Sequence, residues 1–378
     1  MKRTPLHIVH TEASCGWGGQ EIRILTEAEG MIHRGHLVEI WAVPGSDILE
    51  QAVRRAIAHR ALPIERKGLR GIIAVRRALA LTRPDVINTH SSTDAWLVAL
   101  ACRTLRDPPP MVRTRHISAP VPDNRATHWL YTRATRHIVT TGERLRETLI
   151  RDNRYPGDRI TSVPTGIDPA RFHPGEKGAA RRALGLDPSA RYVGIVATLR
   201  SWKGHLYLVD AFARLVADEP GLRLVIVGDG PMRQPIEERI ARLGLASRVT
   251  LAGRQERVEQ WLQALDAFCL PSYANEGVPQ ALLQAMFTGL PVVTTSVGSI
   301  GEAVTDGVTG LVVPPKDAPA LAEALRRLLD DPALAARLGG AARERAPKQF
   351  GLETMLTGME AVFRRLATPV SFSPEPSR

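Results

Sequence analysis

An acidic residue and an amide mark a short predicted helix in the second half of the chain. In NEGVPQALLQAMFTGLPVV, Glu276 precedes Pro279, which suits a first helical turn, and Gln284 lies about a turn and a half further on. A carboxylate at this place can accept hydrogen bonds from sugar or ribose hydroxyls. Both residues could instead serve only the helix, because an acidic group near its N-terminus complements the dipole and Gln284 could lie on a half-buried face.

Two loops, one in each half of the chain, follow apolar strands and begin helices. SCGWGGQE contains Gly18 and Gly19, and ATLRSWKG contains Arg200 and Lys203. Glycines allow close backbone approach, and a helix N-terminus offers N–H groups to an anion, so both loops could bind a diphosphate. The alternatives are a glycine turn in the first loop and a solvated basic turn in the second. The spacing is not GxGxxG, which disfavours a dinucleotide site.

Two histidines follow neighbouring predicted strands of the first half. His90 comes after DVINT, and His116 comes after PMVRTR with Arg115 beside it. A single histidine is usually structural, but two at adjacent strand ends are candidates for sugar contacts. Metal binding is disfavoured because no acidic partner is spaced to complete a site, and the chain has no Asp-x-Asp triplet. We therefore expect neither a metal nor another cofactor.

The chain is basic, with 50 Lys and Arg against 39 Asp and Glu, and most of the excess falls in its first 170 residues. This charge favours an anionic partner. Residues 54–77 interleave apolar and basic side chains, which is typical of a segment lying on anionic lipid, although a solvated helix face would look the same. Nucleic acid is disfavoured because no aromatic residues accompany the charge. The basic residues proposed for the membrane patch are Arg54, Arg55, Arg66, Lys67 and Arg70.

Compartment can be inferred from cysteines and hydropathy. The 3 cysteines are far apart in the sequence and form no CxxC pair, which fits a reducing compartment and no zinc site. The N-terminal apolar run is too short for a signal peptide, and no stretch approaches the roughly 18 apolar residues of a spanning helix. We expect a cytoplasmic protein that can lie on the inner face of a membrane without crossing it.

A chain of 378 residues is too long for one ordinary core, so two domains are expected. Short apolar runs alternate with amphipathic ones twice, which predicts two consecutive doubly wound α/β domains, 1–170 and 171–352. The Pro- and Gly-rich segment 164–178 is a predicted linker. Residues 353–365 are predicted to form a last amphipathic helix, and 366–378 a disordered tail.

Ligands of such sheets bind beyond the carboxyl ends of the strands, so a cleft between the domains is expected. The expected strands of the first half are LHIVH, LVEIWAV, DVINTH, PMVRTRHI, HIVTTG and ITSVPTG. Those of the second half are RYVGIVATL, LRLVIVGDG, VTLAG, DAFCLPS, PVVTTSV and TGLVVPP. The expected helices lie at about 19–34, 47–59, 69–82, 92–105, 125–135, 143–153, 203–217, 231–243, 256–265, 278–288 and 317–331.

In combination, these motifs resemble the fourth family of retaining glycosyltransferases, whose fold is GT-B: two Rossmann-like domains facing a cleft. The resemblance covers nearly the whole chain, with the motifs in the family's order. The segments that carry it are GGQEIRILTEAEGMIHRGHLVEIW, PDVINTHS, ITSVPTGIDPARFHP, LRSWKGHLYLVDAF, VGDGPMR and EGVPQALLQAMFTGLPVVTT. The last is similar to the family's signature of two glutamates separated by seven residues.

The resemblance implies that the first domain binds an acceptor and the second a nucleotide-sugar, with the last helix packing back on the first domain. His116 and Glu276 would be catalytic, and His90 and Arg115 would lie near the acceptor. The implied donor-binding residues are Gly18, Gly19, Arg200, Lys203, Gly228, Gly253, Arg254, Gly277, Val278 and Gln284. The implied reaction transfers a sugar, from a UDP-sugar by family frequency, to a lipid-linked, lipopolysaccharide or polysaccharide acceptor with retention of configuration.

Three positions depart from the family pattern. Gln284 replaces the second signature glutamate, Thr198 replaces the usual arginine of the phosphate loop, and Thr165 replaces the linker asparagine. Two other functions stay open. One is an isomerase of the same architecture, such as a UDP-GlcNAc 2-epimerase, and the other is a non-catalytic nucleotide-sugar binder.

Overall fold

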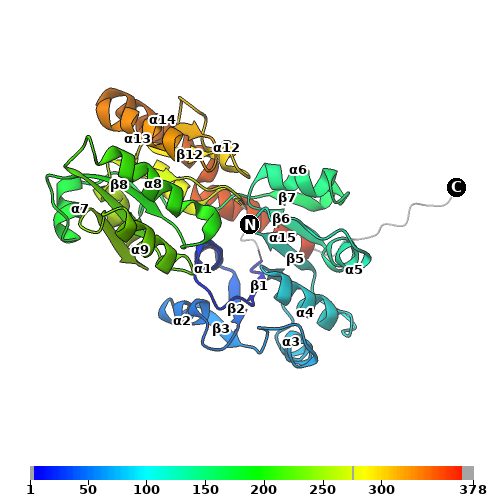
Figure 1. Ribbon diagram of the computed structural model, residues 1–378. Coiled ribbons are helices and arrows are strands. Elements are labelled where there is room, and N and C mark those ends of the chain that lie inside the picture. Colours follow the sequence, from blue (N-terminus) through cyan, green and yellow to red (C-terminus); the bar gives the residue numbers. More distant parts are fainter. Residues whose placement is uncertain (1–3, 275, 368–378) are drawn as a thin grey trace.

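The computed structural model describes residues 4–274 and 276–367, which form two α/β lobes (Figure 1). The first lobe has a parallel sheet in the order β3-β2-β1-β4-β5-β6-β7. Its strands are β1 His7–Glu12, β2 Leu37–Ala42, β3 Ala58–Ala61, β4 Val86–Thr89, β5 Met111–Arg115, β6 His137–Thr140 and β7 Ile160–Ser162. Its helices are α1 Gly19–His33, α2 Asp47–Arg54, α3 Leu69–Thr82, α4 Ser92–Cys102, α5 Arg125–Trp129 and α6 Glu143–Arg151, and a π-helical turn, Leu130–Ala134, follows α5.

The second lobe repeats this plan with a parallel sheet in the order β10-β9-β8-β11-β12-β13. Its strands are β8 Arg191–Val196, β9 Leu222–Val227, β10 Val249–Gly253, β11 Ala267–Leu270, β12 Val292–Thr295 and β13 Leu311–Val313. Its helices are α7 Lys177–Ala183, α8 His205–Leu215, α9 Arg233–Arg242, α10 Val258–Ala264, α11 Gln280–Phe287, α12 Ile300–Ala303, α13 Ala318–Asp330 and α14 Pro332–Phe350. The two-domain doubly wound fold expected from the sequence is confirmed.

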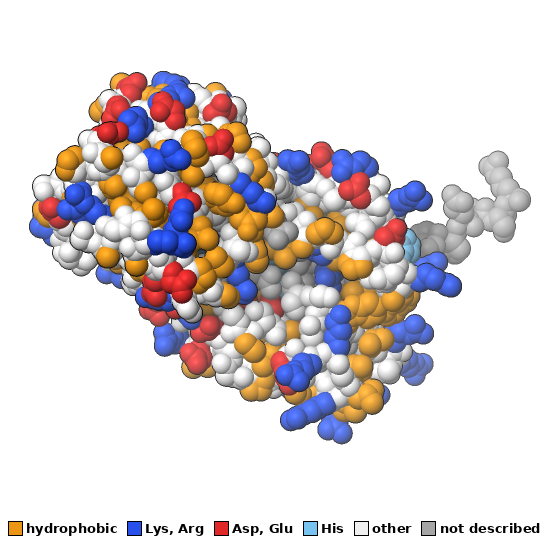
Figure 2. Space-filling view, in the orientation of Figure 1, with side chains coloured by type: hydrophobic (Ala, Val, Ile, Leu, Met, Phe, Trp, Pro, Cys, Tyr) orange, Lys and Arg blue, Asp and Glu red, His pale blue; other side chains and the backbone are white. Residues whose placement is uncertain are grey.

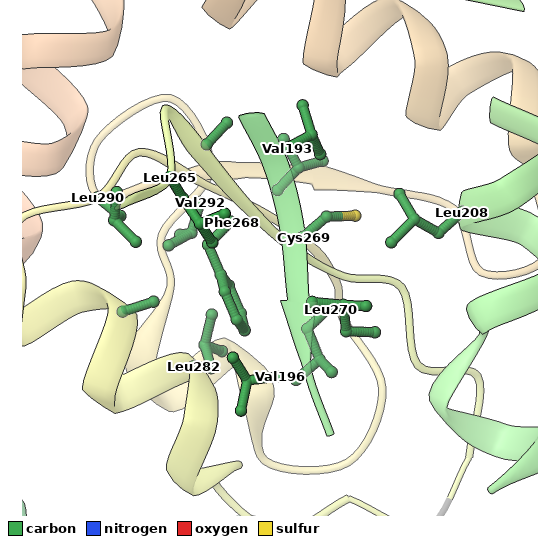
Figure 3. Close-up of a cluster of buried hydrophobic side chains, with 14 of the residues drawn as sticks. Val193, Val196, Leu208, Leu265, Phe268, Cys269, Leu270, Leu282, Leu290 and Val292 are labelled. Atoms are coloured by element: carbon green, nitrogen blue, oxygen red, sulfur yellow. The ribbon is translucent and has the colours of Figure 1, made fainter. Parts of the chain in front are cut away.

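Apolar strands buried on both faces explain why each sheet is covered by helices on both sides. In the second lobe, Phe268, Cys269 and Leu270 of β11 are almost fully buried. Figure 3 shows them between side chains of the neighbouring strands and Leu208 of α8 and Leu282 of α11. Burying one large apolar side chain contributes roughly 1.5–3 kcal/mol. This core fixes the strands whose carboxyl ends carry the loops described below.

One predicted helix was partly wrong. The helix expected at 47–59 ends at Arg54, and the chain continues into the edge strand β3, Ala58–Ala61. Ala56 has φ +53, a left-handed conformation that ends the helical path between them. The strand β3, with the sequence AHRA, lies at the edge of the sheet and is largely exposed. An exposed strand does not need the apolar run by which the other strands were recognised.

The last helix, α15 Leu352–Ala367, leaves the second lobe and packs on the first against α1 and β4. Met359 and Phe363 of α15 are fully buried in the core of the first lobe. Glu360 accepts hydrogen bonds from Arg34, which follows α1, at 2.8 Å and from Arg364 at 2.7 Å. Burial raises the pKa of Glu360, but these bonds outweigh it and lower that pKa to about 2. The helix α15 includes residues 366 and 367, where a disordered tail was expected. The rest of the expected tail, residues 368–378, lies outside the described part of the chain.

Candidate active site

Loops at the carboxyl ends of the two sheets face each other. Gly18, after β1, lies against Thr198, after β8: a Cβ atom on Gly18 would be 3.3 Å from the Thr198 hydroxyl. A Cβ atom on Gly19 would be 3.4 Å from Oε1 of Gln280, the first residue of α11. The two glycines thus bring the first turn of α1 close to the second lobe. A Cβ atom on Gly18 would be closer than an ordinary contact, whereas one on Gly19 would just touch Gln280.

The loop after β11 also packs against the first lobe. A Cβ atom on Gly277 would be 3.0 Å from the carbonyl oxygen of His116 and would overlap the hydroxyl of Thr141. The backbone N–H of Val278 donates to the carbonyl of Thr141 at 3.4 Å. Gly277 and Val278, predicted from the sequence, therefore lie directly beside the predicted His116.

The half-buried Lys203 and the buried Glu276 form an ion pair in the second lobe. The ammonium group of Lys203 lies 2.7 Å and 2.9 Å from the two carboxylate oxygens of Glu276, and Ser272 donates to the same carboxylate at 2.6 Å. Glu276 is 4% exposed. The residues implied for the diphosphate and for the sugar are thus adjacent, and the lysine offsets the charge of the carboxylate.

His116 is the outer member of a row of three histidines. Its Nε2 lies 2.9 Å from Nδ1 of His90, and Nε2 of His90 lies 2.9 Å from Nδ1 of His10. Burial lowers the pKa of all three imidazoles, that of His10 to about 3. His90 is buried behind His116, so it contacts the inner histidine instead of facing the space between the lobes.

The predicted arginines make contacts within the protein. Arg254 pairs with Asp47 of the first lobe at 2.7 Å and lies 4.6 Å above the ring of Trp17. Arg200 lies 5.9 Å from the ring of Trp202. Arg115 donates to the hydroxyl of Tyr131 at 2.6 Å and, from its other terminal nitrogen, to a loop carbonyl. Arg254 thus links the two lobes, and Arg115 supports the loop that follows His116.

The remaining predicted donor residues lie at strand ends or inside α11. Gly228 has φ +139, and a Cβ atom there would overlap the carbonyl of Ala197, so only glycine lets the two loops pack. Gly253 ends β10 with φ +67. Gln284, on α11, is 7% exposed. Its backbone carbonyl accepts a hydrogen bond from the backbone N–H of Thr288. The amide of Gln284 therefore reaches little solvent.

Two buried polar residues of β1 were not predicted. His10 and Glu12 both belong to β1, whose end adjoins the glycine loop. Burial raises the pKa of Glu12 well above its usual value, and the nearby Asp94 and Glu21 add to this effect. Gln20 of α1 donates to the Glu12 carboxylate. Glu12, the last residue of β1, met the strand-end criterion applied to His90 and His116, whereas His10 lies within the strand.

The predicted membrane patch is divided between two places. Arg54 pairs with Glu256 of the second lobe at 2.9 Å, and Arg55 pairs with Glu29 at 3.1 Å. Arg66, Lys67 and Arg70 lie at the start of α3. Figure 2 shows Lys and Arg side chains along the outer edge of the lobe that contains α3, α4 and α5.

Two further observations concern membranes and metals. Among the described residues, no helix is long and apolar enough to cross a membrane. In the same part of the chain, no group of three or more His, Cys, Asp or Glu side chains is arranged to hold a metal ion. The absence of a metal requirement stays a prediction.

Family models match both halves of the chain. Residues 17–171 match the model described as glycosyltransferase family 4, and residues 176–345 match the model described as glycosyl transferases group 1. The chain is 32% identical over 388 positions to a D-inositol 3-phosphate glycosyltransferase of Actinosynnema mirum, covering 90% of this chain and 92% of that protein. It is 35% identical over 214 positions to the lipopolysaccharide core biosynthesis mannosyltransferase LpsB of Rhizobium meliloti, covering 54% of this chain and 61% of that protein.

Solved structures with the same fold cover nearly the whole chain. Anabaena Alr3699/HepE, in complex with UDP-glucose, superposes with a TM-score of 0.86 at 21% identity and covers 96% of this chain and 100% of its own. WaaG, described as a glycosyltransferase involved in lipopolysaccharide biosynthesis, superposes with a TM-score of 0.74 at 18% identity, covering 95% and 99%. At these identities the likeness shows the GT-B fold alone.

Proposed function

Because this chain belongs to the group 1 and family 4 glycosyltransferases, we propose that it transfers a sugar from a UDP-sugar to a lipid-linked, lipopolysaccharide or polysaccharide acceptor with retention of configuration. The observation that carries this proposal is the position of the Lys203–Glu276 pair, next to Gly277, which contacts the carbonyl of His116. The UDP complexes of HepE support the nucleotide, and the relatives LpsB and WaaG support the acceptor class.

Each residue has a defined task in this proposal. Lys203 and the N-terminus of α8 bind the diphosphate, whose charge they offset. Glu276 accepts hydrogen bonds from the donor sugar, and the backbone at Gly277 and Val278 lies beside it. His116 reaches the sugar from the first lobe. The acceptor enters from the first lobe, so the reaction takes place where the two lobes meet.

Electrostatic stabilisation of the departing diphosphate supplies most of the rate enhancement in this proposal. Lys203 and Arg200 are the cations on the loop that follows β8. Approach of the lobes excludes water and so limits hydrolysis of the donor. Retention follows if the acceptor attacks on the face from which the diphosphate leaves, with a donor phosphate oxygen taking its proton. No carboxylate nucleophile is needed for that step.

A screen of UDP- and GDP-sugars for slow hydrolysis tests the proposal without knowledge of the acceptor. Replacing Lys203 with alanine should lower turnover of the accepted donor by roughly 10²–10³-fold, the usual effect of losing one stabilising group. Lys348→Ala, at an exposed ion pair on α14, is the matched control. The first anomer released, followed by proton NMR, reports retention.

The same screen separates the two alternative functions. An isomerase would return an epimerised sugar, which NMR of the products detects. A non-catalytic binder would show nucleotide-sugar binding in calorimetry with no released nucleotide at any enzyme concentration. If no nucleotide-sugar is bound or hydrolysed, the proposed enzyme function is wrong.

We also propose that α3 places the protein on an anionic membrane surface. Arg66, Lys67 and Arg70 flank Leu69, which is 77% exposed, and Ile73 on the same helix is 48% exposed. Each basic residue near such a surface contributes about 1 kcal/mol. Sedimentation with phosphatidylglycerol vesicles tests this: Leu69→Asp should reduce binding, and equal sedimentation of the variant would contradict the proposal.

A further inference from the structure

The three histidines form a continuous chain across neighbouring strands. His10 lies in β1, His90 follows β4 and His116 follows β5, and these strands are adjacent in the sheet. Successive ring centroids are 5.2 Å apart. His10 and His90 are buried, whereas His116 is half-buried. The chain of imidazoles therefore reaches the space between the lobes only at His116.

The inner end of the chain meets a buried ion pair on α1. Nε2 of His10 lies 3.9 Å from Oε1 of Glu27, and Oε2 of Glu27 lies 3.7 Å from Nε of Arg23. All three side chains are fully buried. Within the described residues, Nε2 of His10, Nε of Arg23 and both carboxylate oxygens of Glu27 have no hydrogen-bond partner. Because 3.9 Å exceeds hydrogen-bond length, Glu27 acts on His10 through its charge.

Proton counting couples the three rings. A neutral imidazole carries one N–H and one bare nitrogen, so each contact between two rings holds a single proton. In the first arrangement every ring is protonated at Nε2: His116 donates to His90, His90 donates to His10, and His10 directs its N–H toward Glu27. In the second arrangement every ring is protonated at Nδ1, and each bond is reversed. Only the first leaves Nδ1 of His116 bare.

We propose that Glu27 selects the first arrangement, so that His116 presents a bare Nδ1, a hydrogen-bond acceptor for a hydroxyl of the donor sugar. The physical reason is that a carboxylate near Nε2 of His10 favours the proton on that nitrogen, and the low dielectric of the interior strengthens the effect. Glu27, His10 and His90 are thus positioning residues that act through His116. The hydroxyl contact rests on the proposed function, whereas the protonation of the row does not.

The arrangement should respond to pH near neutrality. Burial raises the pKa of Glu27 to about 7, although the charge of Arg23 opposes this. The groups facing Glu27 are Arg23 on its own helix, His10 on β1 and the uncharged Asn88 on β4. Since the carboxylate form exists above its pKa, the first arrangement holds above about pH 7 and loses its preference below.

Nitrogen NMR of histidine-labelled protein without substrate tests the inference. Long-range proton–nitrogen spectra at about pH 8.5 should show His116 as the Nε2–H form by roughly tenfold over the Nδ1–H form, about 1.4 kcal/mol. Comparison with the spectrum of His116→Asn assigns the signals. Glu27→Gln should bring the two forms to within about threefold. Glu29→Gln, on the same helix but at a surface ion pair, is the matched control and should leave the row unchanged.

A titration of the wild-type protein gives the same test without a substitution, should Glu27→Gln not fold. Lowering the pH to about 6 should produce the Nδ1–H signal of His116, because Glu27 is then protonated. A His116 that is Nδ1–H at high pH, or whose form is unchanged by both Glu27→Gln and pH, would overturn the inference. Because no donor is present, failure of the proposed transferase activity would not mimic either result.

The pH dependence of donor affinity connects the row of histidines to donor binding. For the donor found in the hydrolysis screen, the affinity of the wild-type protein should fall as the pH decreases from about 8 to 6. Glu27→Gln should remove that dependence, because its side chain does not titrate. A role in folding alone would change stability without removing the pH dependence of donor affinity, so an unchanged pH profile would overturn the contact with the sugar.

Discussion

At the residue scale, the most informative position is Gln284. It replaces the second signature glutamate and is buried on α11, the helix that follows Glu276 of the Lys203–Glu276 pair. An amide has the same shape as a carboxylate but no charge. Hydrogen bonds to charged groups are worth about 1.5–3 kcal/mol, compared with about 1 kcal/mol for neutral ones. The substitution therefore predicts weaker donor binding with the geometry retained.

Gln284→Glu should tighten the binding of UDP by roughly fivefold, equal to about 1 kcal/mol. The reason is that a charged acceptor replaces a neutral one where the resemblance places the ribose. Titration calorimetry measures the dissociation constants, and Gln260→Glu on α10 controls for the added charge. Equal affinities of the wild-type protein and the variant would contradict this assignment.

The sequence proposed individual residues for the site, but it did not reveal their contacts with one another. Lys203 and Glu276 were each predicted from strand ends and helix starts, whereas their ion pair joins residues 73 positions apart. His10 was overlooked because it lies within its strand, and its neighbours come from two other strands. Arg254 was assigned to the donor, and only the three-dimensional structure shows its pairing with Asp47. Local patterns predict a residue's place along the chain, and packing decides its contacts.

At the element scale, apolar strands and their helices were predictable because every central strand is buried on both faces. Four of the helices and strands were not expected: β3, α7, α12 and α14. The strand β3 lies at an exposed edge, and α14 contains two adjacent glycines and Pro347, which are unusual inside a helix. The position of α14 depends on its contact with α11, which no local pattern reveals.

The two glycines of α14 should respond in opposite directions to alanine. A Cβ atom on Gly339 would overlap the carbonyl of Gly289, whereas one on Gly340 meets nothing within 4 Å. Gly339→Ala should therefore lower the free energy of unfolding by about 1–3 kcal/mol. Gly340→Ala should raise it by up to about 1 kcal/mol through helix propensity. Urea unfolding measures both, and equal effects would show that α14 does not pack as described.

At the scale of the whole molecule, the lobes are held by a helix cap that crosses between them. The carboxylate of Glu302, in α12, accepts the backbone N–H groups of Glu143 at 2.8 Å and Arg144 at 2.9 Å, the first residues of α6. A helix start left without a cap has free N–H groups. Arg144 also donates from its side chain to the carbonyl of Gly298 at 3.2 Å, which adds a further hydrogen bond from the first lobe to the second.

Glu302→Ala should shift the free protein toward a more open form. Each charge-assisted hydrogen bond contributes about 1.5–3 kcal/mol. Losing two of them is enough to change the relative populations of a closed and an open domain arrangement. Small-angle X-ray scattering without ligand should give a larger radius of gyration than the wild-type protein. Glu323→Ala, at an exposed position of α13, is the control. If Glu302→Ala and Glu323→Ala gave identical scattering, Glu302 would have no role in holding the lobes together.

The return of α15 to the first lobe affects the order in which the chain can fold. The core of that lobe includes Met355, Met359 and Phe363, so its apolar face stays uncovered until the last helix has been synthesised. The first lobe otherwise ends near Ile167, which is 363 − 167 = 196 residues before Phe363. At ribosomal rates of 5–20 residues per second, this delay is about 10–40 s. The lobe that emerges first is completed last, and chaperones on the nascent chain have that interval in which to shield it.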